Sequence, residues 1–301
     1  MKVGFHTTAR FDSPKSRTRP IAFLSGTTVG ATTAALLSLS IAAWSSGAAA
    51  AAAPDKAAPS LETLVSGPQR SPANRARDPF RHPLEDLHFF EVKPTDVVVE
   101  ILPGGSGYWT EILAPYLRDG GRYIAANPPK ADTSNEAVSG NAAFAAKVAA
   151  DPADLGKVTV AEFAPPADLV PPGSADIVLT FRNVHNWMAD DTAQVVFASF
   201  FRALRPGGTL GIEEHRGRAD LPQDPAAKSG YVRQDAVIAI AERAGFRFVA
   251  SSEANSNPKD TKDYPAGVWT LPPTFRLKDK DRDRYAAIGE SDRMLLRFEK
   301  P

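Results

Sequence analysis

Hydrophobic positions from residue 96 onward follow two alternating patterns, one typical of buried strands and one typical of helices. The run Val97–Leu102 is rich in β-branched residues and predicts a buried strand, which Pro103 and the glycines after it end. Apolar residues then return at helical spacing, so a helix is expected over 108–117. A strand, a glycine turn and a helix can together hold a ligand, because the glycines admit it close to the backbone and the free N–H groups of the first helical turn face it.

The same alternation continues to the C-terminus and predicts seven strands in all. The remaining six are expected at 122–126, 157–163, 175–181, 209–213, 246–250 and 294–298. Helices are expected within 136–150 and at 192–204 and 233–243. Strands that alternate with helices favour an α/β fold with a mostly parallel sheet and helices on both of its faces. A charged, proline-rich insertion without a clear period, at 255–291, precedes the last strand.

The start of the chain has a different pattern. Residues 1–20 carry five bases and one acid, residues 21–44 carry no charge, and alanines fill 48–53. This order is typical of a secretory signal peptide, and the apolar stretch is also long enough for an uncleaved membrane anchor. We therefore expect residues 1–53 to direct export. The positive-inside rule then places the remainder in the periplasm or at the outer side of the cytoplasmic membrane.

Residues 54–78 are rich in proline, alanine, serine and arginine and predict a flexible linker with one short helix at 61–65. A further helix is expected within 78–90, where Pro83 is tolerated in a first turn. The interpretation is therefore one domain over 79–301, with the membrane touched only by an uncleaved N-terminal segment.

Composition narrows the chemistry that this domain can carry out. The chain has no cysteine, which excludes disulfides, thiolate zinc sites and a cysteine nucleophile. It has 35 basic and 35 acidic residues, and removal of 1–53 takes away five bases and one acid and leaves a net charge of −4. No basic stripe indicates a nucleic-acid partner. The histidines outside the N-terminal segment have no compact zinc spacing, so no metal site is expected and His185, Glu214 and His215 are not expected to converge on an ion.

Three ordered segments resemble a known family. They read EILPGGSGYWTEILAPYL at 100–117, ADIVLTFRNVHNWM at 175–188 and RALRPGGTLGIEEHR at 202–216. They resemble the glycine motif, the fourth strand with its following loop, and the fifth strand of class I S-adenosylmethionine-dependent methyltransferases. Together with the flanking segments, they resemble a bacterial group of predicted methyltransferases with export signals. The resemblance implies a Rossmann-like sheet whose last strand is antiparallel, and S-adenosylmethionine as the cofactor.

The glycine motif departs from the family pattern, which has an acid and then glycines two, four and six residues later. Glu100 is the acid, but Leu102 stands at the first glycine position. Gly104 matches the second position, and either Gly105 or Gly107 serves as the third. By resemblance these glycines admit the amino-acid end of the cofactor, and Glu100 orients their loop. An ordinary tight turn and a structural ion pair are the alternatives that need no ligand.

The resemblance also assigns cofactor roles to the ends of strands two, three and four. Asn127 stands where the family has an acid that grips both ribose hydroxyls, and an amide lacks that charge-assisted bidentate acceptor. Glu162 and Phe163 stand where the family contacts the adenine, and the alternative for Phe163 is a role in the core alone. Arg182 and Asn183 follow strand four and border the transferred methyl group.

Candidate catalytic residues lie at the carboxyl edge, where open α/β sheets bind ligands. His185 lies in the segment after strand four and is a candidate general base near neutral pH. His215, at the end of strand five, is the second candidate base, and Glu214 is placed to hold its tautomer. The structural alternative for His185 is a network that stabilises its loop, and for Glu214 and His215 it is a solvated charged loop.

These observations predict methyl transfer from S-adenosylmethionine to a small or lipid-like acceptor. Such a transfer depends mainly on positioning, so no obligatory catalytic residue is required. One alternative is an exported binding protein that keeps the fold without the cofactor, which Leu102 and Asn127 favour. The other is an exported hydrolase that uses Ser106 or His215, although the sequence around Ser106 misses the G-x-S-x-G nucleophile elbow by one residue.

Overall fold

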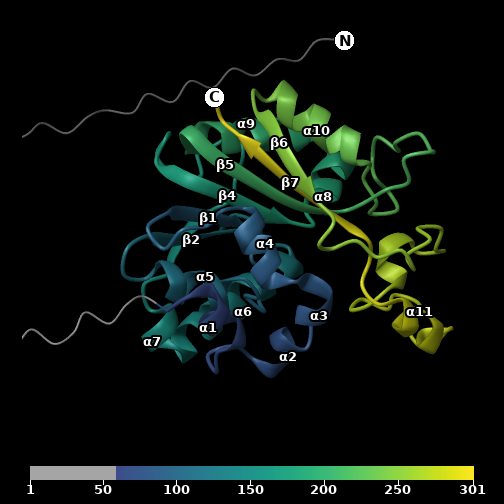
Figure 1. Cartoon of the computed structure of the whole chain (residues 1–301), viewed down its shortest axis with the longest axis horizontal. Helices are drawn as coiled ribbons and strands as arrows, with labels where there is room; N and C mark the ends of the chain where they lie inside the picture. The colour runs from purple at the N-terminus through teal and green to yellow at the C-terminus, as the bar shows by residue number, and fades with distance from the viewer. Residues whose placement is uncertain (1–58) are drawn as a thin grey trace, which may run out of the picture. The chain divides into compact units, whose positions relative to one another are not determined.

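Seven strands form one sheet in the order β3-β2-β1-β4-β5-β7-β6 (Figure 1). The strands are β1 (Val97–Ile101), β2 (Arg122–Asn127), β3 (Thr159–Glu162), β4 (Ala175–Phe181), β5 (Leu204–His215), β6 (Arg247–Ser252) and β7 (Arg293–Glu299). All neighbouring pairs among β1 to β5 are parallel, and β7 runs antiparallel between β5 and β6. The prediction of seven strands, mostly parallel with the last one antiparallel, is confirmed.

This computed structural model describes residues 59–301. The expected signal peptide or anchor, 1–53, and the first residues of the expected linker lie outside the described residues. None of the helices within 59–301 combines the length and the apolar character that crossing a membrane requires.

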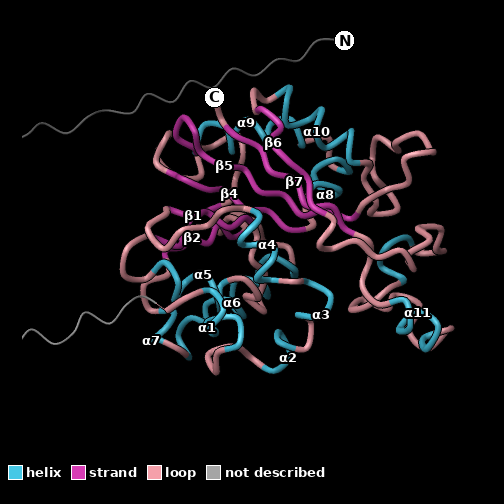
Figure 2. The backbone as a smooth tube through the Cα atoms, in the orientation of Figure 1, coloured by secondary structure: helices cyan, strands magenta, loops and turns pink. Residues whose placement is uncertain are grey.

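Helices cover both faces of the sheet (Figure 2). One face packs against α9 (Ala193–Ala203) and α10 (Gln234–Arg243), and the other against α5 (Thr110–Leu117), α6 (Asn135–Ala150) and the N-terminal helices. The shorter helices are α1 (Leu61–Ser66), α2 (Pro72–Arg75), α3 (Asp78–Arg81), α4 (Pro83–Phe89), α7 (Pro152–Leu155), α8 (Val184–Ala189), η1 (Gly267–Thr270) and α11 (Arg282–Ile288).

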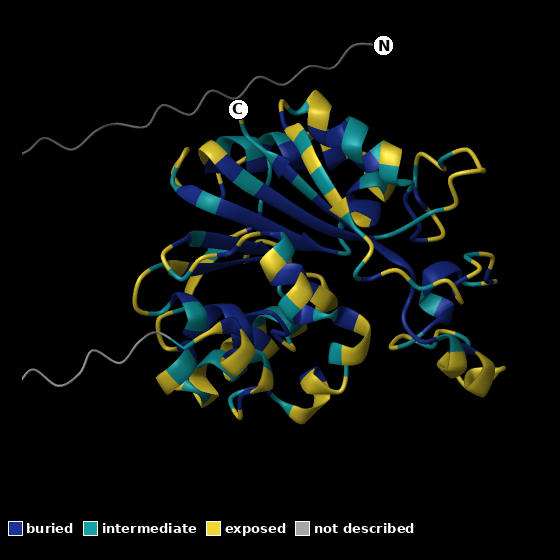
Figure 3. Cartoon of the chain, in the orientation of Figure 1, coloured by how far each residue is buried: buried dark blue, intermediate teal, exposed yellow. Residues whose placement is uncertain are grey.

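Alternate residues of a strand pack on opposite faces of the sheet. In β1, Val99 and Ile101 pack on the α9–α10 side, whereas Val98 packs on the α5 side. The central strands are buried along most of their length, and the edge strand β6 alternates between exposed and half-buried residues (Figure 3). Gly211 lets the ring of Phe90 approach β5 closely, because a Cβ on Gly211 would lie 2.7 Å from that ring.

The segment expected to be a flexible linker is, over its described part, helical and packed on the domain. Arg70 is buried and donates two hydrogen bonds to Asp78, at 2.5 and 2.8 Å. Asn74 is buried and donates to the carbonyl oxygen of Ser106 at 3.0 Å. The composition predicts an exposed linker because it considers each polar side chain alone. In the fold these side chains have hydrogen-bond partners and pack on the domain.

Three further segments differ from expectation in detail. The helix expected within 78–90 is two helices, because His82 between them has a left-handed backbone with φ 39°. The segment after β4, expected to be a loop, forms the short helix α8. The insertion 255–291 contains η1 and α11, whose residues form a small apolar cluster with Tyr231.

Candidate functional site

A large cavity lies at the carboxyl ends of β1 and β2. Its volume is about 1170 Å³. Five of the predicted cofactor residues line it, namely Gly104, Gly105, Asn127, Phe163 and Asn183. The connection after β1 leads to the α5 face and the connection after β4 leads to the α9 face. Adjacent strands whose connections go to opposite faces leave a crevice between them, and in open α/β sheets ligands bind there.

Backbone geometry shapes the β1 end of this cavity. Leu102 has φ 53° and Gly104 has φ 69°, so both lie in the left-handed region that favours glycine. Leu102 therefore adopts a conformation that glycine adopts without strain, at a steric cost to a non-glycine residue of roughly 1–2 kcal/mol. Gly105 lies against α6, where an added Cβ would come within 2.7 Å of the Cβ of Ala143. The departure from the motif at Leu102 thus leaves the turn intact.

Asn127 supplies the polar group at the end of β2. The residue is 7% exposed, and its backbone carbonyl accepts a hydrogen bond from the Phe163 N–H at 2.7 Å. Within residues 59–301 no group is hydrogen-bonded to the side-chain amide of Asn127. A polar side chain that is nearly buried, faces a cavity and has no partner is available to a ligand. Phe163, with its ring 5.7 Å from that of Trp187, adds an apolar wall.

The other predicted cofactor residues do not line the cavity. Glu100 points to the α5 face, where its carboxylate accepts a hydrogen bond from the Tyr123 hydroxyl at 2.5 Å. Gly107 lies in the same turn but against Lys147, and Glu162 is exposed on the edge strand β3. Arg182 has φ 59° and forms an ion pair with Glu213.

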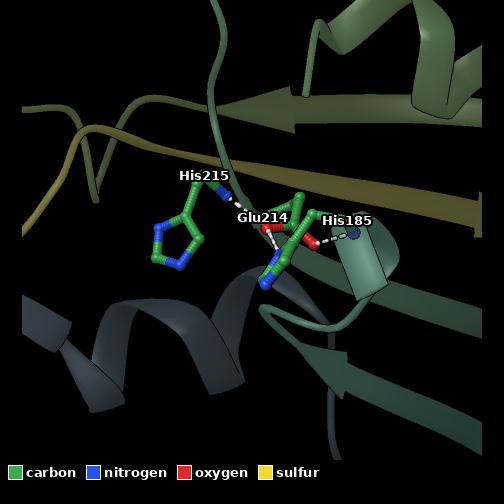
Figure 4. A group of neighbouring side chains, drawn as sticks. All are labelled: His185, Glu214 and His215. Atoms are coloured by element: carbon green, nitrogen blue, oxygen red, sulfur yellow. Dashed lines mark hydrogen bonds and ion pairs between the residues drawn. The ribbon is translucent and has the colours of Figure 1, made fainter. Parts of the chain in front are cut away.

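His185, Glu214 and His215 form a second group at the ends of β4 and β5 (Figure 4). His185 Nδ1 lies 3.0 Å from Glu214 Oε1, and the His185 backbone N–H donates to Oε2 at 3.3 Å. The backbone N–H of His215 donates to Glu214 Oε1 at 2.7 Å, while its ring Nδ1 is 2.6 Å from Ser291 Oγ. Glu214 therefore orients the imidazole of His185 and not, as predicted, that of His215.

This geometry is that of a histidine–carboxylate pair. A carboxylate on Nδ1 fixes the tautomer and stabilises the imidazolium, which leaves Nε2 of His185 as the basic atom. Burial lowers the pKa of His215 well below its ordinary value. The nearby charges of His185, Arg182, Arg293 and Arg81 lower this pKa further, so the His215 ring is neutral at neutral pH.

Contrary to the expectation from spacing, these three residues do converge, with one possible ligand atom from each within 4.8 Å of the others. However, the Glu214 carboxylate already accepts three hydrogen bonds from its two neighbours. Its lone pairs are thus largely engaged, which favours the histidine–carboxylate pair over a cation site.

Four arginines border this second group, and sequence reasoning missed all but Arg182. Arg77 and Arg293 form ion pairs with Glu290 at 2.7 and 2.6 Å, and Arg293 also pairs with Glu213 at 2.8 Å. Burial alone would raise the pKa of Glu290, but Arg293, Arg81 and Arg77 hold it at about 2. Arg77 and Arg81 lie in a segment that the sequence places in a linker or at the edge of the domain, so no sequence pattern indicated their role.

The C-terminal insertion covers the same group of residues. The ring centroid of Trp269 in η1 is 5.9 Å from that of His185, and the centroid of Tyr231 is 6.4 Å from that of His215. His185 and Trp269 are 84 residues apart in the printed sequence, and the absence of a period in 255–291 gave no signal for their contact. Tyr231 precedes the insertion and lies 16 residues after His215.

Ser106 does not form a hydrolytic site with either histidine. Its side chain is exposed on the turn after β1, and its backbone carbonyl accepts the hydrogen bond from Asn74. Nucleophilic catalysis by serine needs a base within hydrogen-bond reach, and among the described residues no histidine is bonded to Ser106.

Comparisons with known proteins find related folds. No protein-family model and no curated protein matches the chain. Among solved structures, the [4+2]-cyclase SpnF has 15% identity and a TM-score of 0.52 over 78% of this chain and 86% of its own. A SAM-dependent methyltransferase from Aquifex aeolicus has 19% identity and a TM-score of 0.47 over 64% of this chain and 90% of its own. The glycopeptide N-methyltransferase MtfA, complexed with sinefungin, has 16% identity and a TM-score of 0.47 over 73% of this chain and 85% of its own.

The strand order and the likeness to SpnF agree on one architecture. The chain has a seven-stranded Rossmann-like α/β fold, which it shares with SpnF. Because SpnF is named as a cyclase, the fold does not by itself specify the reaction.

The buried carboxyl group of Glu100 gives a testable dependence of stability on pH. Burial raises its pKa from 4.5 to about 7, and the Tyr123 hydrogen bond only partly opposes this. The folded state therefore favours the protonated form, and stability is lost as pH rises from 4.5 to about 7. Glu100→Gln stays neutral, so it should match the wild type at about pH 4 and exceed it at pH 8 by up to about 3 kcal/mol in urea unfolding.

The matched control for this measurement is Glu162→Gln, because Glu162 also lies near the carboxyl end of a parallel strand but is exposed. It should follow the wild type at both pH values. Equal stability of Glu100→Gln and wild type at pH 8 would contradict the buried, protonated carboxyl group.

Proposed function

We propose that this protein binds S-adenosylmethionine in the cavity at the ends of β1 and β2 and transfers its methyl group to a small or lipid-like acceptor. The single observation that supports this most is the unpartnered Asn127 amide on the wall of a cavity at the crevice of this fold. The residues present fit the cofactor in chemistry: glycine backbone, one ribose-facing polar group and one aromatic wall.

The binding roles follow from position along the cavity. Gly104 and Gly105 would let the amino-acid end of the cofactor approach the backbone. Asn127 would bond the ribose, and Phe163 would pack against the adenine. An amide offers one acceptor oxygen where a carboxylate offers two, so ribose binding would be weaker than with an acid by about 1–2 kcal/mol.

When bound, S-adenosylmethionine supplies an electrophilic methyl group on a sulfonium. Transfer would form a bond from a lone pair of the acceptor's oxygen, nitrogen or sulfur to the methyl carbon, and the electron pair of the broken methyl–sulfur bond would stay on sulfur. Nε2 of His185 would take the proton that a hydroxyl, amine or thiol acceptor loses, and Glu214 would stabilise the resulting imidazolium. His185 would later release this proton to water.

Binding is tested by calorimetric titration of the full chain with S-adenosylmethionine. Gly104→Ala should weaken binding about ten-fold or more, because the added methyl group occupies space on the cavity wall. Gly173→Ala is the matched control: its φ of 71° nearly equals the 69° of Gly104 and neither has a neighbour within 4 Å, but Gly173 lies in a turn before β4. No heat from the wild type at millimolar ligand would refute the proposal, and so would equal weakening in both variants.

The ribose role of Asn127 predicts an unusual gain. Asn127→Asp restores a bidentate acceptor and should tighten S-adenosylmethionine binding about ten-fold. Asn186→Asp places the same charge on the cavity wall away from β2, and so controls for general attraction of the sulfonium. Equal effects of the two variants would exclude a specific bond from residue 127 to the ribose.

We also propose that the domain acts outside the cytoplasm, which the basic, apolar and alanine-rich order of residues 1–53 supports. A C-terminal fusion to a reporter that is active only outside the cytoplasm should give signal, and deletion of 21–44 should abolish it. A reporter that is silent in the intact fusion would reject export.

A further inference from the structure

Arg81 is a buried guanidinium without a hydrogen bond. The residue ends α3 and is 4% exposed. Its Nε is buried and unpartnered, its nearest carboxylate contact is Glu290 Oε2 at 3.6 Å, and none of its nitrogens is hydrogen-bonded to a described residue. A guanidinium has five N–H donors, and burying them without acceptors is costly.

A neighbouring arginine shows how this protein satisfies such a group when its role is structural. Arg70 and Arg81 both lie over the Tyr108 ring, at 5.0 and 4.5 Å from its centroid. Arg70 donates two hydrogen bonds to Asp78 and a third to the Val65 carbonyl at 2.9 Å. Arg81 has the same aromatic support and none of these acceptors.

The carboxylates near Arg81 are already engaged by other arginines. Glu290 pairs with Arg77 and Arg293, and Glu213 pairs with Arg182 and Arg293. Burial and the nearby Glu213 raise the pKa of Asp86 well above its ordinary value, which favours its neutral form. Arg77, Arg182 and Arg293 each have a carboxylate within 2.8 Å, whereas the nearest carboxylate contact of Arg81 is 3.6 Å away, so Arg81 is the least compensated of the four guanidinium groups.

The guanidinium of Arg81 lies near His215, which neighbours the histidine–carboxylate pair. Arg81 and Arg182 are both close enough to His215 to lower its pKa, and Glu290, the contact of Arg81, precedes Ser291, which bonds the His215 ring. Figure 1 shows α3, α8 and the C-terminal insertion around the same end of the sheet. Trp269 and Tyr231 supply aromatic surface at the two histidines.

We propose that the acceptor is an anion whose carboxylate or phosphate group binds the guanidinium of Arg81, next to His185. This inference rests on the proposed methyl transfer and narrows its acceptor to an acid. A planar guanidinium matches a carboxylate or phosphate bidentately, and its stacking on Tyr108 holds its orientation. Arg182, which is only partly buried, lies on the same side and adds positive charge to the approach.

The test is titration of the full chain with benzoate, inorganic phosphate and benzamide as a neutral isostere of benzoate. The wild type should bind one of the anions at least about ten-fold more tightly than benzamide, and comparison of the two anions separates a carboxylate from a phosphate preference. Arg81→Met should weaken that binding at least about ten-fold, and Arg81→Lys, which keeps the charge but loses the fork, should lie between.

Arg297→Met is the matched control. Arg297 also has a buried, unpartnered Nε and also lies over an aromatic ring, that of Phe89, but it sits in the middle of β7. It should bind the anions within about two-fold of the wild type. Wild-type affinities that are equal for benzoate, phosphate and benzamide would overturn the proposal, and so would equal losses in Arg81→Met and Arg297→Met.

Unfolding in urea separates ligand binding from a structural role. Because Arg81 makes no hydrogen bond in the fold, Arg81→Met should be at least as stable as the wild type without ligand. A marked loss of stability in Arg81→Met would assign Arg81 to the structure and overturn the proposal.

A parallel titration with S-adenosylmethionine keeps this test distinct from that of the proposed function. Binding of S-adenosylmethionine without Arg81-dependent anion binding overturns the anionic acceptor alone. Arg81-dependent anion binding without S-adenosylmethionine binding overturns methyl transfer, and with it the assignment of the anion as an acceptor.

Discussion

Glu213 and Glu214, adjacent at the end of β5, are both fully buried, and the surrounding structure is arranged to compensate their charges. Successive strand residues point to opposite faces, so the two carboxylates need separate partners. Arg182 and Arg293 pair with Glu213, while His185 and the backbone of α8 satisfy Glu214. Leaving either carboxylate unpaired would cost several kcal/mol, so the first residues of α8 and β7 are held at the end of β5.

The N-terminal helices and the C-terminal insertion are part of the same arrangement. Arg77 from the beginning of the domain and Arg293 from its last strand share Glu290, which lies at the end of the insertion. These contacts join segments more than 200 residues apart in sequence, so the carboxyl edge of the sheet is closed by both ends of the domain. The cavity beside β1 and β2 remains open in the same fold.

The fold supports a conclusion about architecture, and the site supports a proposal about the reaction. The strand order and the likeness to SpnF establish a Rossmann-like α/β architecture, and SpnF itself is named as a cyclase. The proposal of methyl transfer therefore rests on particular groups: an unpartnered amide at Asn127, a glycine-lined turn, and a histidine held by Glu214. A buried arginine without an acceptor is the kind of local conflict that functional sites retain at the expense of stability.

The sequence by itself determined the elements and their order, because strand and helix periods are local. The β-branched run at 97–101, the helix-spaced residues of α9 and the alternation between them predicted seven strands and a parallel sheet. The glycine turn and the strand ends also placed Asn127 and Phe163 at the correct edge. Only the tertiary structure decided that Leu102 adopts a left-handed backbone, that Glu214 orients His185 and not His215, and that 59–78 packs on the domain. It alone brought Arg81 to the site, since pairing among buried charges depends on contacts between distant segments that no local pattern records.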